Sequence, residues 1–278
     1  MDGKRIEYLK TQAKEVRKNI ITAVCAGVTG HVGGSLSIAD AVTLLYFHVM
    51  HVNPENPHMK NRDRLILSKG HCGPALYGAL ALKGYFPKEE LLTMNQPGTH
   101  LPSHCDMLLT PGVDMTAGSL GQGLSCAVGI ALAAKLTGGT ETVYAIIGDG
   151  ESQEGQIWEA SMAAVQRKLD NLIVFLDYNH MQVDGMLEDI VDLLDPVKKW
   201  GAFGFRVYES DGHDMKAMHA AIEKAKTERD GRPALIVLHT VKGKGVAFLE
   251  KMGPSNHNAL ISPEQAKAAI AEIDKDVI

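Results

Sequence analysis

Apolar residues along the chain follow two alternating patterns. Short runs rich in Ile, Leu and Val predict buried strands, at residues 64–67, 143–147, 172–176, 205–208 and 235–238. Longer segments with apolar positions at helical spacing lie between them, at about 74–82, 121–136, 154–168 and 215–228. This alternation is typical of a mostly parallel sheet with helices on both faces, so we predict an α/β fold.

The N-terminal part of the chain predicts two helices. Residues 4–26 combine charged and apolar positions at helical spacing, and glycines break that pattern over 27–34. A second, more buried helix is predicted at 38–50, with Ser37 as its N-cap. We therefore expect a helical layer ahead of the first strand.

Two later segments complete the predicted organisation. Residues 95–120 form a long stretch with prolines, glycines and histidines but no periodic pattern, and connections of that length are usually functional or disordered. Residues 263–274 again have the spacing of a helix. We expect one domain over 1–278, with a helical tail at about 263–278.

Composition excludes several classes of partner. The chain has 278 residues, is 45% hydrophobic and carries a net charge of −5. An acidic balance argues against a nucleic-acid surface, and no apolar stretch is long enough to cross a bilayer. The four cysteines form no C-x-x-C pair, and the N-terminus does not resemble a signal peptide. These features favour a cytoplasmic protein that binds neither nucleic acid nor membrane.

Polar residues follow two of the predicted strands. Gly148-Asp149-Gly150-Glu151 comes directly after 143–147, and Asn179 comes shortly after 172–176. Ligands of open α/β sheets bind at the carboxyl ends of the strands. A carboxylate, an amide oxygen and a main-chain carbonyl are the ligands that Mg²⁺ or Ca²⁺ prefers, with further positions left for phosphate oxygens. The pair therefore predicts a site for a metal ion and a diphosphate.

Asp149 also has a simpler interpretation, as the N-cap of a turn in which the glycines supply positive φ. A similar choice applies to 118–123, a glycine-rich segment ahead of a predicted helix. Its amides predict contact with an anion or a flat ring, whereas close helix packing is the alternative for Gly121, Gly123 and Ser125, and it is equally favoured for Gly123 and Ser125. Asp149 and Asn179 together favour the ligand site.

Four of the twelve histidines lie in irregular segments near predicted strand or helix ends. They are His31, His71, His104 and His257. Histidine titrates near neutral pH, so each is a candidate for proton transfer. The other histidines have ordinary structural settings, and His213 is assigned to a turn before a helix.

Several motifs resemble those of the thiamine diphosphate enzymes, and among them the transketolase family. The stretch from Gly148 through Asn179 to Gly185 is similar to the cofactor-anchoring motif of the superfamily. Four further segments resemble transketolases in particular: 29–34 (TGHVGG), 67–71 (LSKGH), 117–123 (AGSLGQG) and 241–245 (VKGKG). They occur in the order of the family and span nearly the whole chain. The resemblance implies the thiamine diphosphate-binding fold.

The resemblance also implies roles for individual residues. It implies Mg²⁺, with Ca²⁺ as a possible substitute, bound by Asp149, Asn179 and the carbonyl of Met181. His31 and His104 are implied to face the sugar substrate. His257 is implied to lie against the cofactor, near its diphosphate and the reacting carbonyl, and all three are implied to act in catalysis. The remaining implied contacts to thiamine diphosphate come from His71, Gly118, Ser119, Leu120, Gly150, Glu151 and Lys242, together with Asp149, Asn179, Met181 and His257. In 255–259 the glycine usual in the family is missing, which affects the alignment of His257.

Transketolases transfer a two-carbon ketol unit from a ketose phosphate to an aldose phosphate, as in the pentose phosphate pathway. In that family a second domain carries the glutamate that activates the cofactor and the arginines that hold the sugar phosphate. The sequence stops at Ile278 without such a domain. The resemblance therefore implies the N-terminal subunit of a split transketolase, active with a separate C-terminal subunit in an α2β2 heterotetramer.

Two other functions stay open on the sequence. The alpha subunit of a 2-oxo acid dehydrogenase has the same Gly-Asp-Gly and Asn signature, although 67–71 and 241–245 look like transketolase. A module that binds the diphosphate without catalysis is the second alternative. Glu154 resembles an acid that the family buries at a subunit contact, and it is also suited to the first turn of a helix.

Overall fold

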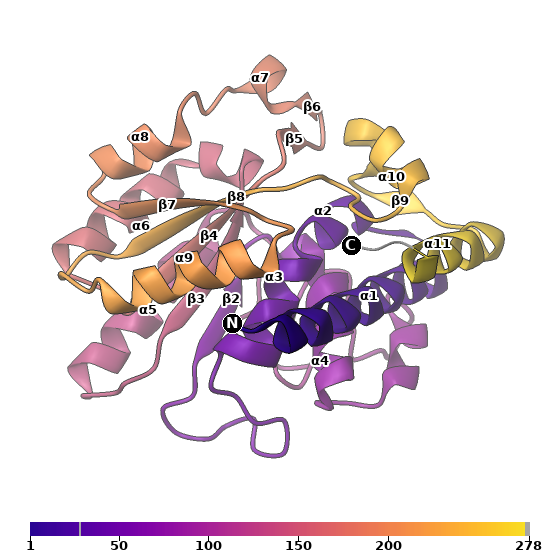
Figure 1. Ribbon diagram of the computed structural model, residues 1–278, viewed down its shortest axis with the longest axis horizontal. Helices are drawn as coiled ribbons and strands as arrows, with labels where there is room; N and C mark the ends of the chain where they lie inside the picture. Colours follow the sequence, from indigo (N-terminus) through magenta and orange to yellow (C-terminus); the bar gives the residue numbers. More distant parts are fainter. Residues whose placement is uncertain (28, 276–278) are drawn as a thin grey trace.

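The computed structural model describes residues 1–27 and 29–275 and contains a central sheet of five parallel strands (Figure 1). The order of the strands is β2-β3-β4-β8-β7. Their bounds are Arg64–Leu67 for β2, Val143–Gly148 for β3, Leu172–Tyr178 for β4, Arg206–Asp211 for β7 and Ala234–His239 for β8. All five predicted strands are therefore confirmed, with ends that differ by at most three residues.

Alternate residues of each strand face two separate cores. In β3, Tyr144 and Ile146 belong to one core, whereas Val143, Ala145 and Ile147 belong to the other. Successive side chains of a strand point to opposite faces, and parallel sheets are covered on both, which explains the continuous apolar runs. Every residue of β4 is buried because it lies in the middle of the sheet.

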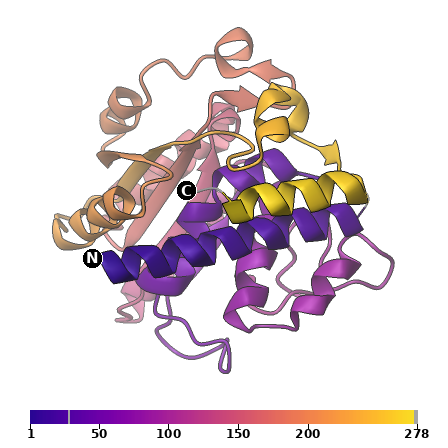
Figure 2. The ribbon, with the colours of Figure 1, turned by 45° about the vertical axis from the view of Figure 1, so that its right-hand side comes forward.

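Helices cover both faces of the sheet. Helices α1, α3, α4, α9 and α11 contribute to the first core, and α5, α6 and α8 to the second. Helix α11 lies beside α1, as Figures 1 and 2 both show. The helices are α1 Gly3–Ala26, α2 Val32–Ser37, α3 Ala39–Leu44, α4 Gly73–Lys83, α5 Gln122–Leu136, α6 Gly155–Gln166, α7 Leu187–Ile190, α8 Pro196–Ala202, α9 Met215–Thr227, α10 Ala247–Lys251 and α11 Pro263–Lys275.

Two pairs of short antiparallel strands lie outside the main sheet. Strand β1, Thr29–Gly30, pairs with β9, Ala259–Leu260, and β5, Met181–Gln182, pairs with β6, Gly185–Met186. Single turns of 3-10 helix occupy Gly70–Cys72, Lys88–Thr93, Gly150–Gln153 and Gly253–Asn256. None of these elements was predicted, because each is too short to show a period.

The prediction for the segment after α1 was wrong in two respects, the start of the helical region and the N-cap. Helix α2 begins at Val32, inside the predicted break, whereas the helix predicted at 38–50 is confirmed as α3 continued by the π-helical turn Leu45–Val49. Ser37 is not an N-cap: it ends α2, and its hydroxyl donates to Gly34 O and to the Asp177 carboxylate. The Ser37 side chain therefore binds the buried Asp177 carboxylate of β4 and does not cap a helix.

The remaining helix predictions are confirmed. Residues 95–120 contain no helix or strand, as expected. Helix α11 corresponds to the helix predicted at 263–274, while the predicted extension over 276–278 lies outside the described residues. In the described part of the chain, no helix is long and apolar enough to cross a membrane. Because the main strands are parallel, the segments that follow β2, β3, β4 and β8 all leave the sheet at the same edge.

Candidate functional site

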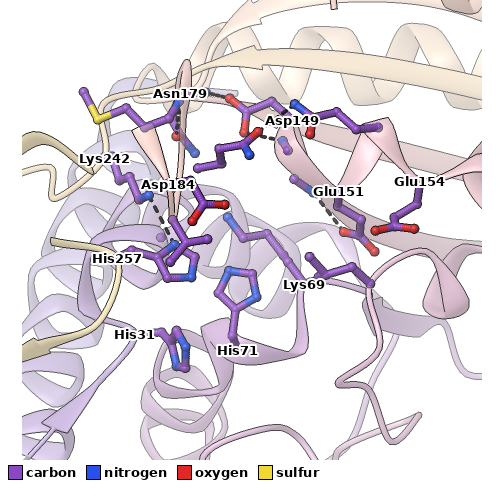
Figure 3. A pocket seen from close by; sticks show the side chains of 18 of the residues that line it. His31, Lys69, His71, Asp149, Glu151, Glu154, Asn179, Asp184, Lys242 and His257 are labelled. Atoms are coloured by element: carbon purple, nitrogen blue, oxygen red, sulfur yellow. Dashed lines mark hydrogen bonds between the residues drawn. The ribbon is translucent and has the colours of Figure 1, made fainter. Parts of the chain in front are cut away.

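A cavity of about 350 Å³ lies at this edge of the sheet, and Figure 3 shows it from close by. His31, His71 and His257 lie on one side of it, and Asp149 and Asn179 lie on the other. Every residue that the sequence placed in the site lines the cavity except Ser119, which is exposed. The other residues predicted for the site that line the cavity are His104, Gly118, Leu120, Gly150, Glu151, Met181 and Lys242.

The Asp149 carboxylate accepts three main-chain hydrogen bonds. Its Oδ1 accepts from Gly150 N at 2.8 Å, and its Oδ2 accepts from Asn179 N at 2.9 Å and from His180 N at 2.6 Å. The carboxylate therefore joins the end of β3 to the end of β4. Neither Gly148 nor Gly150 has a positive φ, so that part of the simpler turn interpretation is wrong. Gly150 is needed for space, because a Cβ there would lie 3.0 Å from Gln182 Cβ.

The electrostatic setting of Asp149 suits a cation. Burial, and then the nearby Asp177 carboxylate, raise the pKa of Asp149 to about 6. A buried carboxylate without a cationic partner is costly, and a divalent ion would remove that cost. In the described residues, no three His, Cys, Asp or Glu side chains form a metal cluster, so amide or carbonyl oxygens would have to complete any coordination.

Hydrogen bonds fix the orientation of the Asn179 amide. Its Nδ2 donates to Asp177 Oδ2 at 3.0 Å, and its Oδ1 accepts from Met181 N at 3.1 Å. An amide oxygen has two lone pairs, so one remains for a metal ion. The oxygen-rich set of Asp149, Asn179 and the Met181 carbonyl therefore fits a hard divalent cation.

Asp177, the penultimate residue of β4, collects the polar groups behind the cavity. Its fully buried carboxylate accepts from Ser37 Oγ at 2.7 Å, from Thr240 Oγ1 and from Lys69 Nζ, in addition to Asn179. Burial alone would raise the pKa of Asp177, but the Lys69 ammonium outweighs it and the pKa is lowered. Asp177 is not among the residues predicted for the site, although a charged residue at the end of a buried strand is itself an indication of a site.

Four histidine rings lie close together on the opposite side. The ring centroid of His31 lies 5.2 Å from those of His71 and His257 and 5.3 Å from that of His104. Burial, followed by His104 and Lys242, lowers the pKa of His31 to about 4, and burial and Lys242 lower the pKa of His257 to about 3. Burial also lowers the pKa of His71 and of His104. All four imidazoles are therefore neutral at pH 7, each with one donor and one acceptor nitrogen.

Lys242 connects this cluster to the strand ends. Lys242 is only 3% exposed, and its Nζ lies 3.3 Å from His257 Nδ1. Burial, and then Lys69, lower the pKa of Lys242 to about 8. Lys242 is therefore buried beside the cavity and not solvated. The buried ammonium groups of Lys69 and Lys242 both line the cavity, and two such charges suit an anionic ligand such as a diphosphate.

The glycine-rich segment 118–123 has two different uses. A Cβ on Gly118 would have His104 Cδ2 as its nearest neighbour, at 3.9 Å, so this position leaves room for a ligand. Gly121 N instead donates to Glu151 Oε1 at 2.8 Å, so the predicted free amide is wrong at this residue. A Cβ on Gly123 would lie 2.5 Å from Ser68 Oγ, which supports the close-packing alternative there.

The Glu151 carboxylate forms hydrogen bonds to three separate segments of the chain. Besides Gly121 N, the buried carboxylate accepts from Gly148 N at 3.0 Å and from the Ser68 hydroxyl. Glu154, which the sequence placed near a subunit contact, also lines the cavity and is exposed.

The chain matches one family model over nearly all of its length. Residues 9–272 match the family described as "Transketolase, thiamine diphosphate binding domain". The chain is 53% identical to the 6-deoxy-6-sulfo-D-fructose transketolase subunit SqwG of Clostridium sp. (strain MSTE9), over 96% of this chain and 97% of that protein. It is 37% identical to one of the subunits of the apulose-4-phosphate transketolase of Phocaeicola vulgatus, over 98% of this chain and 96% of that protein.

Solved structures agree with these matches. The transketolase from Leishmania mexicana superimposes with a TM-score of 0.90 at 31% identity, over 96% of this chain and 41% of that one. The transketolase from Campylobacter jejuni superimposes with a TM-score of 0.88 at 33% identity, over 98% of this chain and 43% of that one. The chain thus spans less than half the length of these transketolases.

Proposed function

The chain belongs to the transketolase family, as an N-terminal subunit of a split transketolase with the thiamine diphosphate-binding fold, and on that premise we propose how its cavity binds cofactor and substrate. The convergence of Asp149, Asn179 and Lys242 on one cavity carries the proposal. A divalent metal ion, Mg²⁺ or in its place Ca²⁺, is held by the Asp149 carboxylate, the Asn179 amide oxygen and the Met181 carbonyl.

Lys69 and Lys242, together with the metal ion, would hold the diphosphate group of the cofactor. Lys69 and Lys242 place positive charge beside the cavity, and Gly150 and Gly118 leave room for the ligand. The rest of the cofactor contacts His71, His257, Leu120 and the neighbouring Ser119 and Glu151. When bound, thiamine diphosphate supplies the nucleophilic carbon to which the ketol unit is transferred.

Three histidines act on the sugar. His31, His104 and His257 are neutral, so each can donate a hydrogen bond to a sugar oxygen, and His31 and His104 can also accept a proton at the other ring nitrogen. The contact of Lys242 Nζ with His257 Nδ1 leaves the proton of His257 on Nε2. A cluster of this kind suits cleavage and formation of a carbon–carbon bond beside a hydroxyl group, because a proton moves in both directions.

The substrates are a ketose donor and an aldose acceptor that carry a terminal anionic group. Among the described residues that line the cavity there is no arginine, so we assign that anion to the separate C-terminal subunit. The two subunits form an α2β2 heterotetramer. One relative is named for 6-deoxy-6-sulfo-D-fructose and another for apulose-4-phosphate. The first donor to test is therefore 6-deoxy-6-sulfo-D-fructose, with D-fructose 6-phosphate as the comparison. The pentose phosphate pathway and a cytoplasmic location stay predictions.

The matches do not support the alpha subunit of a 2-oxo acid dehydrogenase. A module that binds the diphosphate without catalysis is the remaining alternative. Ketol transfer by the complex with the C-terminal subunit distinguishes the two. Cofactor binding without turnover of any ketose would favour the module.

The metal site is tested by Asp149→Asn. Loss of the carboxylate charge removes the strongest ligand, so Mg²⁺-dependent binding of thiamine diphosphate, measured by calorimetry on the complex, should be abolished. Asp184→Asn is the control, because Asp184 also lines the cavity but lies on the exposed turn between β5 and β6. Unchanged affinity in Asp149→Asn would show that the metal is bound elsewhere.

A further inference from the structure

A buried ion pair lies outside the cavity, between two helices. Arg17 of α1 and Asp40 of α3 have side-chain exposures of 0% and 2%. The pair is bidentate: Arg17 Nη1 lies 2.9 Å from Asp40 Oδ1, and Nη2 contacts Oδ2. Burial alone would raise the pKa of Asp40, yet Arg17 and His213 together lower it to about 2. Buried ion pairs are costly to desolvate and are weak evidence for stability, so this pair calls for another explanation.

Asp40 also holds His213, which lies between β7 and α9. His213 Nδ1 lies 2.8 Å from Asp40 Oδ2, and His213 Nε2 lies 2.9 Å from Val241 N. A main-chain N–H can only donate, so Nε2 is the acceptor and the proton of the ring lies on Nδ1. Asp40 therefore selects the tautomer that can accept from Val241. The expectation that His213 lies in a turn before a helix is confirmed, but it misses this bridge.

The Arg17–Asp40 pair also contacts the chain on the C-terminal side of Lys242. Arg17 Nε donates to Lys244 O at 3.2 Å, while His213 holds Val241 N. The residues on both sides of Lys242 are thus fastened to one buried pair. From this position the Lys242 side chain extends into the cavity, where its Nζ lies 3.3 Å from His257 Nδ1.

We propose that His213 is a positioning residue, which holds the main chain of Val241 so that Lys242 is placed for the diphosphate and for His257, and that Asp40 supports it by selecting the tautomer of its ring. Neither residue touches the cavity, so both act through Lys242. The proposal rests on the proposed function, because Lys242 is taken to face the cofactor. It adds a connection from α1 and α3 to the site that the motifs do not indicate.

Two substitutions of His213 separate its two hydrogen bonds. An Asn side chain ends near the position of Nδ1, so His213→Asn keeps a donor for Asp40 and loses the acceptor for Val241. A Gln side chain reaches the position of Nε2, so His213→Gln keeps the acceptor for Val241 and loses the donor for Asp40. Each variant loses one hydrogen bond of the residue 213 side chain, so the two should lose similar amounts of stability and each serves as the control for the other.

Two measurements follow the main chain and the site separately. Hydrogen exchange at the Val241 amide of the full chain reports the bond to His213. Calorimetry of thiamine diphosphate with Mg²⁺ on the complex with the C-terminal subunit reports the placement of Lys242. In His213→Asn, exchange at Val241 should accelerate and cofactor affinity should fall about fivefold, the factor for one hydrogen bond of about 1 kcal/mol. In His213→Gln, both should stay near wild type, while the melting temperatures of the two variants fall together.

The result that overturns the proposal is equal behaviour of the two variants, since a purely structural role responds to loss of either bond. Unchanged exchange at Val241 in His213→Asn would overturn it as well. If the wild-type complex does not bind the cofactor, the proposed function fails, and the exchange comparison still decides whether His213 holds Val241.

Discussion

At the scale of single residues, burial decides the charge state of the histidines in the cavity. The pKa of His31 is about 4 and that of His257 about 3, both lowered chiefly by burial from an ordinary value of 6.5. The folded state therefore binds these protons less readily than the unfolded state does. Neutral imidazoles are thus built into the fold before any ligand arrives.

This difference predicts a loss of stability in acid. Because the folded pKa values are below the unfolded one, the contribution to stability is complete above pH 6.5 and is lost as the pH falls toward 4 and then 3. The melting temperature of the chain without cofactor should therefore fall over this range. In His257→Gln, which cannot titrate, the fall measured by calorimetry should be less steep; an identical slope would contradict the pKa assignment.

The Lys69–Asp177 pair predicts a large effect of a single substitution. Lys69→Met leaves the fully buried Asp177 carboxylate without its cation, and breaking a buried pair costs about 3–5 kcal/mol. Denaturant unfolding should show this decrease in the free energy of unfolding. Lys198→Met is the control, because the Lys198–Asp195 pair is exposed and its loss should not be measurable. A similar decrease in the free energy of unfolding for the two substitutions would show that burial does not increase the contribution of the Lys69–Asp177 pair.

At the same scale, the sequence predicts which residues form the site better than it predicts how they are held. Asp149 and Asn179 follow strand ends, so parallel topology alone brings them together. The position of Asp177 at a strand end is visible in the sequence, but its partners Ser37 and Thr240, and the partner Val241 of His213, are not, because they lie far along the chain. Only the tertiary structure brings such donors and acceptors within reach of one another.

At the scale of elements, length separates what can be predicted from what cannot. The five strands of the main sheet and the helices α1, α4, α5, α6, α9 and α11 each repeat their period often enough to be recognised. The segment 32–50 is broken into short pieces instead. Ser37 is directed to Asp177 and Asp40 to Arg17, so polar contacts with distant elements determine where these helices end.

Helix α5 gives a test of close packing against the sheet. A Cβ at Gly123 would lie 2.6 Å from the Cα of Ser68, so Gly123→Ala should destabilise the chain by about 1–3 kcal/mol. Gly129 on the same helix has nothing within 4 Å, so Gly129→Ala should stabilise it by about 0.5–1 kcal/mol. Thermal unfolding of the two variants measures this difference in sign, and two changes of the same sign would contradict the packing argument.

At the scale of the whole molecule, the cavity is open toward an apolar surface. Leu120 and Val183 line the cavity and are exposed by 38% and 59%. Exposed apolar groups around a site are typical of a surface that binds another protein. They support the proposal that the C-terminal subunit covers the cavity and completes the site.

The whole molecule therefore predicts activity only in the complex. The purified chain should fold and bind thiamine diphosphate weakly, and ketol transfer should appear when the C-terminal subunit is added. Titrating one subunit with the other while following product formation measures this dependence. Ketol transfer by the chain alone at the rate of the complex would contradict the division of the site between two subunits.

The carboxylate of Glu151 has a mechanical consequence. It accepts hydrogen bonds from Ser68 after β2, from Gly148 at the end of β3 and from Gly121 ahead of α5. One side chain thus holds together three segments that are far apart in the sequence. Loss of this carboxylate would therefore loosen the end of β3, which lines the cavity, at the same time as the two neighbouring loops.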